Sequence, residues 1–314
     1  LSFGIAFGLG YVVIPFLHKL SFGQTILDIG PKWHKEKQGT PTMGGLAFIA
    51  AISFALSAAC IYLYYGANDR QAASSVLISL IFSLGNALIG VFDDLTKLFR
   101  KENAGLTPLQ KIVFQLILAI VFLMAKSYFL GDTTVLKFSF GDVDISLLYY
   151  PLAIILLLGI VNCANLTDGI DGLAASVAVT IGIVFSFRAG PYLSEASFLS
   201  AATLGGALGF LLFNRHPAKI FMGDTGSLFL GALAVSTAFS FENPIIIIPV
   251  GGVYIIEGIS VILQVLIFKL TKKRLFKMAP FHHHLEKSGF SENKICILAV
   301  LFTLALSLIS LWIF

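Results

Sequence analysis

Charged residues are scarce in this sequence. Asp, Glu, Lys and Arg make up 12% of its 314 residues, whereas soluble domains carry about 25%. Hydrophobic residues make up 57%, and the mean hydropathy is +0.91. The shortage of charge excludes an ordinary soluble domain. It predicts an all-α polytopic membrane protein, with one integral membrane domain over residues 1–314 and the lipid bilayer as its surroundings.

Cysteines are few, and the printed sequence starts without a basic stretch. The three cysteines, Cys60, Cys163 and Cys296, lie in or beside apolar runs without paired spacing, so neither a disulfide framework nor a zinc site is predicted. The chain opens in an apolar run without Met and without a basic leader. We therefore expect residues 1–20 to form a first span whose beginning is missing, and not a cleaved signal peptide.

Long apolar runs dominate the remainder. A membrane-spanning helix needs about 20 mostly apolar residues. Ten runs qualify, although several are short and 227–240 is the weakest, so about ten transmembrane helices are predicted, with nine as the alternative. The runs lie at 1–20, 44–65, 72–92, 109–130, 147–163, 172–188, 198–213, 227–240, 245–270 and 294–314.

Basic residues are distributed unevenly between the loops. By the positive-inside rule, loops rich in Lys and Arg face the cytoplasm, and both termini are then external. On the external side, residues 131–146 alternate polar and apolar side chains around Gly141 and predict a small β-hairpin. Of the 21 Lys and Arg residues, the ones outside the loops after odd-numbered spans are Arg70, Lys126, Lys137 and Arg188.

Five aspartates gather on the predicted cytoplasmic side. Asp93 and Asp94 directly follow a long apolar run. Charges near hydrocarbon are rare and usually functional, and neighbouring carboxylates repel unless a proton or a cation neutralises them. A helix end resting at the lipid headgroups is the simpler interpretation. It is weakened because Asp168, Asp171 and Asp224 recur at equivalent places.

Two Asp-Gly units stand close together after the fifth predicted span. Asp168 and Asp171 are three residues apart and would share a face if the turn is helical. Gly169 permits close approach of the backbone to a ligand. A turn capped by Asn165 and the aspartates is the simpler alternative. Because no Lys or Arg lies in the segment 162–172 to neutralise the acids, we favour a ligand or cation site.

A basic segment precedes Asp224. Arg215 and Lys219 can hold phosphate oxygens, and Gly223 and Gly226 flank the aspartate. A helix that starts there would direct free N–H groups at an anion. A capped helix start after a basic loop is the alternative, but the combination favours a metal-bridged phosphate.

Three consecutive histidines, His282, His283 and His284, follow another basic loop. Adjacent histidines on a helix point in different directions, and no Cys lies near. We therefore favour phosphate contact and proton handling over a zinc site.

Glu257 lies inside the predicted span 245–270. Pro249 and two glycines precede it and predict a kinked or broken helix. Glu257 either faces the site or is a buried, hydrogen-bonded Glu, and the two interpretations are equally supported. A groove along the second half of this helix would hold a lipid tail.

Together these residues predict Mg²⁺-dependent phosphoryl-type transfer at the cytoplasmic membrane face. Carboxylates bind Mg²⁺ through oxygen and often bridge it to substrate phosphates. Basic side chains nearby, with Lys97 and Lys111 as the candidates, would neutralise developing phosphate charge. An acceptor that reaches the site from the membrane is expected to be a lipid.

The motifs resemble those of the bacterial phospho-N-acetylmuramoyl-pentapeptide transferases, within the polyprenyl-phosphate N-acetylhexosamine-1-phosphate transferase superfamily. The matching pieces cover nearly the whole chain in order. The run Pro-Phe-His-His-His-Leu-Glu points most specifically to the muramoyl branch. The pieces are Gly39–Gly45, Phe92–Asp94, Asn165–Gly172, Gly223–Ser227 and Pro280–Glu286.

The resemblance implies transfer of phospho-N-acetylmuramoyl-pentapeptide from its UDP carrier to undecaprenyl phosphate. That reaction forms lipid I and releases UMP, with Mg²⁺, in peptidoglycan biosynthesis at the bacterial cell membrane. It implies that Asp224 is the Mg²⁺ ligand, that Asp93 and Asp94 activate the lipid phosphate or bind metal, and that His283 and His284 are essential. Residues that match the family's nucleotide-sugar pocket are Lys37, Asn165, Asp168, Gly169, Asp171, Asn214 and Phe221, with the Phe221 ring suited to stack on uracil. Lys97, Lys111 and His282 are further candidates for substrate binding.

Two other functions stay open. Another enzyme of the superfamily would use UDP-N-acetylglucosamine, although the histidine run argues against it. A transporter would also fit about ten spans with an intramembrane Glu257, but its site would lie near the midplane and no inverted repeat is visible. No nucleic-acid partner is expected, and a homodimer is one candidate for the oligomeric state, which the sequence leaves open.

Overall fold

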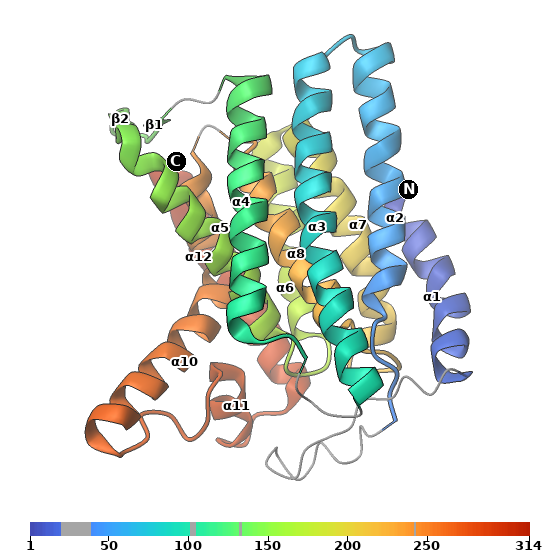
Figure 1. Ribbon diagram of the computed structural model, residues 1–314, viewed down its shortest axis with the longest axis vertical. Helices are drawn as coiled ribbons and strands as arrows, with labels where there is room; N and C mark the ends of the chain where they lie inside the picture. Colours follow the sequence, from blue (N-terminus) through green and yellow to red (C-terminus); the bar gives the residue numbers. More distant parts are fainter. Residues whose placement is uncertain (20–38, 101–104, 132–133, 242) are drawn as a thin grey trace.

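The structure of the protein, a computed structural model, is almost entirely helical (Figure 1). It describes all residues except 20–38, 101–104, 132–133 and 242. The long helices are α1 (Ser2–Lys19), α2 (Gly45–Ile61), α3 (Arg70–Arg100), α4 (Pro108–Leu130), α5 (Tyr149–Thr167), α6 (Leu173–Ala189), α7 (Glu195–Asn214), α8 (Gly223–Ala238), α10 (Gly252–Thr271) and α12 (Glu292–Ile313). The short elements are η2 (Tyr62–Gly66), β1 (Val135–Leu136), β2 (Val143–Asp144), η3 (Ser146–Leu148), η4 (Pro244–Ile246), α9 (Ile247–Val250) and α11 (Phe281–Glu286).

Eight of the described helices are long and apolar enough to cross a membrane. They are α1, α2 continued by η2, α3, α4, α5, α7, α10 and α12. Helices α6, with 17 residues, and α8, with 16, coincide with two further predicted runs but are shorter. The multi-pass architecture is thus borne out, whereas the count of ten and the external termini stay predictions.

Helix α3 continues past the apolar run that predicted it. It extends to Arg100, so Asp93 and Asp94 belong to the helix and do not follow its end. Both side chains are buried inside the protein. The interpretation of this pair as a helix end at the lipid headgroups is therefore wrong, because the acids face partner helices.

The predicted break in the run 245–270 is confirmed. Elements η4 and α9 occupy its beginning, and Gly251 separates α9 from α10. Glu257 lies on α10, one and a half turns after this break, and is buried.

Helix α8 is the centre of the bundle. All its residues from Thr225 to Ala238 are buried, and it packs against α2, α3, α5 and α7. Close approach requires glycine, because a Cβ at Gly90 of α3 would collide with the backbone of Asp224. A Cβ at Gly231 of α8 would lie 2.8 Å from the Cβ of Ala164 in α5. The first half of α8 is therefore packed closely against α3 and α5.

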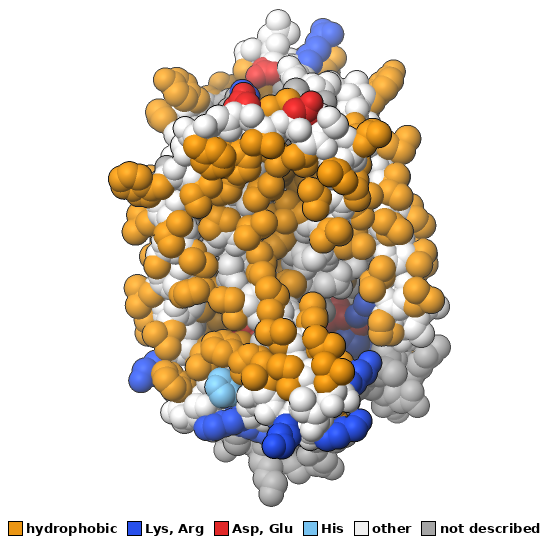
Figure 2. All heavy atoms as spheres, turned by 90° about the vertical axis from the view of Figure 1, so that its left-hand side faces the viewer, with side chains coloured by type: hydrophobic (Ala, Val, Ile, Leu, Met, Phe, Trp, Pro, Cys, Tyr) orange, Lys and Arg blue, Asp and Glu red, His pale blue; other side chains and the backbone are white. Residues whose placement is uncertain are grey.

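The two ends of the molecule differ in charge. The β-hairpin and the start of α3 lie at one end (Figure 1). We call the opposite end, with the end of α3, the start of α4 and α11, the basic end. Figure 2 shows an apolar belt between them, with most Lys and Arg side chains at the basic end. The predicted hairpin is confirmed by antiparallel pairing of Val135 with Asp144 and of Leu136 with Val143.

Candidate active site

Asp93 lies at the centre of a group of charges near the basic end. Its Oδ2 is 2.6 Å from Lys97 Nζ, one turn further along α3, and its Oδ1 is 3.0 Å from Lys111 Nζ of α4. The backbone N–H of Leu106 donates to Oδ1 at 2.7 Å. The chain before α4 passes so close that a Cβ at Gly105 would collide with the Asp93 carboxylate. Asp93 is thus fixed by three elements.

Asp224 shares both lysines with Asp93. Its Oδ2 accepts from Lys97 Nζ at 3.1 Å and from Lys111 Nζ at 2.7 Å. Its Oδ1 accepts from Asn165 Nδ2 of α5 at 3.0 Å. The two acids from α3 and α8 and the two lysines from α3 and α4 therefore form one network.

Asp94 points to the start of α8. Its Oδ1 accepts from the Asp224 backbone N–H at 3.2 Å. Its Oδ2 accepts from the Thr225 N–H at 3.0 Å and from the Thr225 hydroxyl at 2.7 Å. The expectation that this helix start directs free N–H groups at an anionic ligand is therefore wrong for these two groups, because a protein carboxylate already caps them.

The three carboxylates can also hold a cation. One oxygen of each of Asp93, Asp94 and Asp224 lies within 4.8 Å of the others. All the donor atoms are hard oxygens, which suit Mg²⁺ better than a soft transition metal. The ammonium groups of Lys97 and Lys111 lie against Asp93 and Asp224 and neutralise part of their charge, so a bound cation would share these carboxylates with the lysines. The residues present fit Mg²⁺.

Asp168 directly follows the end of α5. Burial and the charges of Asp224, Asp94 and Asp171 raise the pKa of Asp168 well above its usual range. The next residue, Gly169, lies against the ring of His282, since a Cβ there would collide with Nε2. The turn thus connects the acidic network to the histidine segment.

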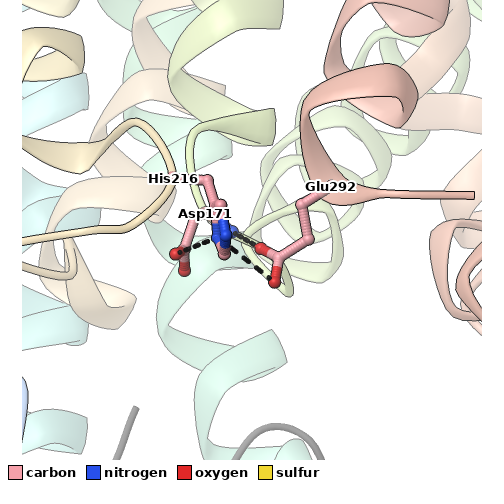
Figure 3. Close-up of side chains that lie close together, drawn as sticks. All are labelled: Asp171, His216 and Glu292. Atoms are coloured by element: carbon pink, nitrogen blue, oxygen red, sulfur yellow. Dashed lines mark hydrogen bonds and ion pairs between the residues drawn. The ribbon is translucent and has the colours of Figure 1, made fainter. Parts of the chain in front are cut away.

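Asp171 contacts His216 and Glu292, which belong to other parts of the chain. The turn between them is not helical, so the condition for a shared face is not met. Asp171 Oδ2 lies 3.0 Å from His216 Nδ1, and the Asp171 N–H donates to Glu292 Oε2 at 2.7 Å (Figure 3). Among the described residues, these three side chains form the second group with metal-type donor atoms within 4.8 Å of one another.

Asn214 ties the same turn to the loop before α8. Its Oδ1 accepts from the Gly172 N–H at 3.2 Å, and its Nδ2 donates to the Ile220 carbonyl at 2.9 Å. Phe221 follows, with its N–H bonded to the Pro41 carbonyl and its carbonyl to the Gly44 N–H, both at 2.8 Å. Its ring is partly exposed. Lys37 lies outside the described residues.

His282 is held by Glu257. The Glu257 carboxylate accepts from the His282 backbone N–H at 3.2 Å and lies 3.1 Å from its Nδ1. Because an ionised carboxylate only accepts hydrogen bonds, Nδ1 carries the proton. Nε2 is buried without a hydrogen-bond partner among the described residues. Glu257 is thus a buried, hydrogen-bonded Glu that also orients a candidate site residue.

The other two histidines make contacts within their own segment. His283 Nδ1 lies 2.6 Å from Glu286 Oε2. His284 Nδ1 accepts from the Lys277 N–H at 3.2 Å, and its ring packs against Phe276 and Phe281. Both rings are partly exposed at the basic end.

An apolar groove runs between α5 and α10. It encloses about 370 Å³ and reaches from Leu136, in strand β1 of the hairpin, to Cys163 and Gly258 beside Glu257. Isoleucines of α10 line it at 255, 259 and 262. The predicted groove along the second half of this broken helix is therefore present.

Sequence reasoning missed several contributors to the site. His216 and Glu292 were not singled out, although His216 stands in the segment before Asp224. Gly105, Leu106 and Thr225 were also missed as partners of the acidic pair. Spacing carries no signal for contacts between residues more than 100 positions apart. Asp93 and Leu106 are only 13 positions apart. Their contact could not be predicted for another reason, because it depends on where α3 ends.

Comparisons with known proteins identify the family of the chain. Residues 76–242 match the glycosyl transferase family 4, and residues 37–49 match a phospho-N-acetylmuramoyl-pentapeptide-transferase signature. The chain is similar to proteins named phospho-N-acetylmuramoyl-pentapeptide-transferase. That of Acetivibrio thermocellus is 42% identical over 95% of this chain and 88% of its own. Those of Halalkalibacterium halodurans and Clostridium perfringens are 40% and 44% identical, over 100% and 94% of this chain and 96% and 89% of their own.

Proposed function

The chain belongs to the phospho-N-acetylmuramoyl-pentapeptide transferase family, and on this premise we propose the reaction and the residues that carry it out. The protein transfers phospho-N-acetylmuramoyl-pentapeptide from its UDP carrier to undecaprenyl phosphate, forming lipid I and releasing UMP. The active site faces the cytoplasm of a bacterial cell. The observation that carries the proposal is the network of Asp93, Asp224, Lys97 and Lys111 at the basic end.

Asp224 is the Mg²⁺ ligand in this proposal, with Asp93 able to complete the cation site. Bound Mg²⁺ would neutralise charge on the phosphates of the nucleotide-sugar. Asn165 fixes the Asp224 carboxylate through its Oδ1. Lys97 and Lys111, which reach both acids, hold phosphate oxygens when substrate is present.

Asp93 and Asp94 have different roles. Both oxygens of Asp94 receive hydrogen bonds from the start of α8. Asp94 therefore positions Asp224. Asp93 is bound by two lysine amines and one backbone N–H and takes no part in capping α8, so its carboxylate is the one that activates the incoming lipid phosphate.

The nucleotide-sugar pocket is formed around the 165–172 turn. Gly169 lets the donor approach the backbone, Asp168 faces the acidic network, and Phe221 stacks on uracil. Asp171 and Asn214 shape this pocket through their bonds to neighbouring loops. Lys37 completes it. His282 Nε2 contacts the donor, while His283 and His284 contact phosphate and handle protons.

The apolar groove between α5 and α10 holds the polyprenyl chain. Its lining is almost wholly aliphatic, and it ends beside Cys163 and Gly258, next to Glu257. Because Glu257 holds His282, the groove leads from the hydrocarbon belt toward the catalytic end. A single domain over residues 1–314 thus binds both substrates.

Two alternatives are tested together with this proposal. Another enzyme of the superfamily would use UDP-N-acetylglucosamine, and a transporter would release no UMP. Purified protein in lipid nanodiscs is supplied with undecaprenyl phosphate, Mg²⁺ and either nucleotide-sugar. UMP release from UDP-N-acetylmuramoyl-pentapeptide alone supports the proposal. Release from UDP-N-acetylglucosamine alone, or from neither, contradicts it.

A further inference from the structure

Asp171, His216 and Glu292 join three separate parts of the chain (Figure 3). Asp171 belongs to the turn between α5 and α6, His216 to the loop between α7 and α8, and Glu292 begins α12. His216 Nδ1 lies 3.0 Å from Asp171 Oδ2 and 3.6 Å from Glu292 Oε1. Because ionised carboxylates only accept hydrogen bonds, this nitrogen carries the proton that faces both acids.

Backbone groups hold the same cluster. The Asp171 N–H donates to Glu292 Oε2 at 2.7 Å, and the Ala218 N–H donates to Asp171 Oδ2 at 3.0 Å. Asp171 is 3% exposed and Glu292 is 9% exposed, so water satisfies little of their charge. Removal of the His216 ring would leave two buried carboxylates close together, and these repel one another.

The cluster fixes the turn that carries the proposed donor site. Asp168 and Gly169 precede Asp171 by three and two residues. Gly169 lies against His282, and the Gly172 N–H donates to Asn214. A displacement of Asp171 therefore moves the backbone that would meet the nucleotide-sugar, while Asp93 and its lysines stand on α3 and α4.

We infer that His216 and Glu292 are positioning residues that set the affinity for the nucleotide-sugar donor by fixing the 168–172 turn. The inference rests on the proposed function, because that function makes this turn part of the donor pocket. Neither residue acts on the reacting atoms. Their loss therefore weakens donor binding more than it slows the chemical step.

Steady-state kinetics test the inference. His216→Ala and Glu292→Ala are expected to raise the donor KM about tenfold, the effect of losing one charge-assisted hydrogen bond, with kcat within a factor of about two. Glu292→Gln keeps an oxygen for the Asp171 N–H and is expected to stay near the wild-type KM. In the double variant His216→Ala/Glu292→Gln, one of the two negative charges is removed. The donor KM is therefore expected to rise less than in His216→Ala alone. The control is His18→Ala, an exposed histidine at the end of α1.

Three kinetic outcomes would overturn the inference. They are an unchanged KM in both alanine variants, a fall in kcat without a rise in KM, and equal effects of Glu292→Gln and Glu292→Ala. If His216→Ala fails to fold, the two Glu292 variants decide.

Hydrogen exchange separates this inference from the proposed function. Glu292→Ala is expected to speed exchange at the Asp171 and Gly172 amides and to leave the amides of α8 unchanged. If the wild type releases no UMP, the proposed function is wrong. The hydrogen-exchange measurement does not depend on activity, so it still tests whether Glu292 fixes the turn. Unchanged exchange at both amides would contradict it.

Discussion

The carboxylate of Asp94 in α3 caps the N-terminus of α8 at Thr225, which lies 131 positions further along the chain. Thr225 donates both its N–H and its hydroxyl to one oxygen of Asp94. This cap places Asp224, the preceding residue, opposite Asp93. The adjacent acids therefore divide their roles, with one holding the helix and the other facing the lysines.

The substitution Asp94→Asn should lower stability and activity together. An amide keeps one acceptor oxygen but loses the charge that the start of α8 favours, so we expect a loss of about 1–2 kcal/mol. Thermal unfolding in detergent measures it. Asp69→Asn is the matched control, because exposed Asp69 accepts the Ala72 N–H at the start of α3, at the other end of the molecule. If Asp94→Asn kept the wild-type melting temperature but lost turnover, Asp94 would act in the chemical step and would not serve mainly to hold α8.

The substitution Asp93→Asn should act on the chemical step. If Asp93 activates the lipid phosphate, kcat falls by about 10²–10⁴-fold, the range for a general base, with little change in the donor KM. The assay uses saturating undecaprenyl phosphate. Wild-type kcat in both Asp93→Asn and Asp94→Asn would mean that the pair is structural.

The raised pKa of Asp168 predicts a pH-dependent stability. The protonated form of Asp168 is favoured in the folded protein. Its contribution to the stability of the fold is therefore fully present below about pH 3.9, the usual pKa of an Asp side chain. The contribution is lost as pH rises through the raised value. Without Mg²⁺, Asp168→Asn should therefore raise the melting temperature by a few degrees at pH 7. The difference between the melting temperatures at pH 5 and pH 7 should be smaller for the variant than for the wild type. Parallel pH profiles for variant and wild type would refute this account.

The orientation in the membrane is testable with single cysteines. The charge asymmetry predicts that positions 97 and 273 face the cytoplasm and position 142 faces outward. In a background without Cys60, Cys163 and Cys296, an impermeant thiol reagent added to intact cells should label position 142. Labelling at 273 but not at 142 would reverse the orientation.

Periodicity and composition predicted the parts of the fold that depend on local sequence. The apolar runs located the long helices, Pro249 and the glycines located the break before α10, and the alternation around Gly141 located the hairpin. Each of these features arises from residues that are neighbours in the chain. The end of α3 was misplaced because Asp93 and Asp94 broke the apolar run without breaking the helix.

The candidate site was predicted only in part for the same reason. Short motifs identified the aspartates, but the partners of Asp94 and Asp171 lie more than 40 positions away. Such pairings depend on how helices pack, as where Gly90 lets α3 approach α8. The spacing of residues in a single sequence does not predict which helices pack this closely.

In the proposed function, Asp224 binds the Mg²⁺ required for transfer from UDP-N-acetylmuramoyl-pentapeptide to undecaprenyl phosphate. The most direct measurement is UMP release against Mg²⁺ concentration for the wild type and Asp224→Asn, both shown to be folded by thermal unfolding. Loss of a carboxylate ligand removes the charge that holds a hard cation. We expect Mg²⁺-dependent release by the wild type and none by the variant across the titration. Near-normal release by folded Asp224→Asn would contradict it.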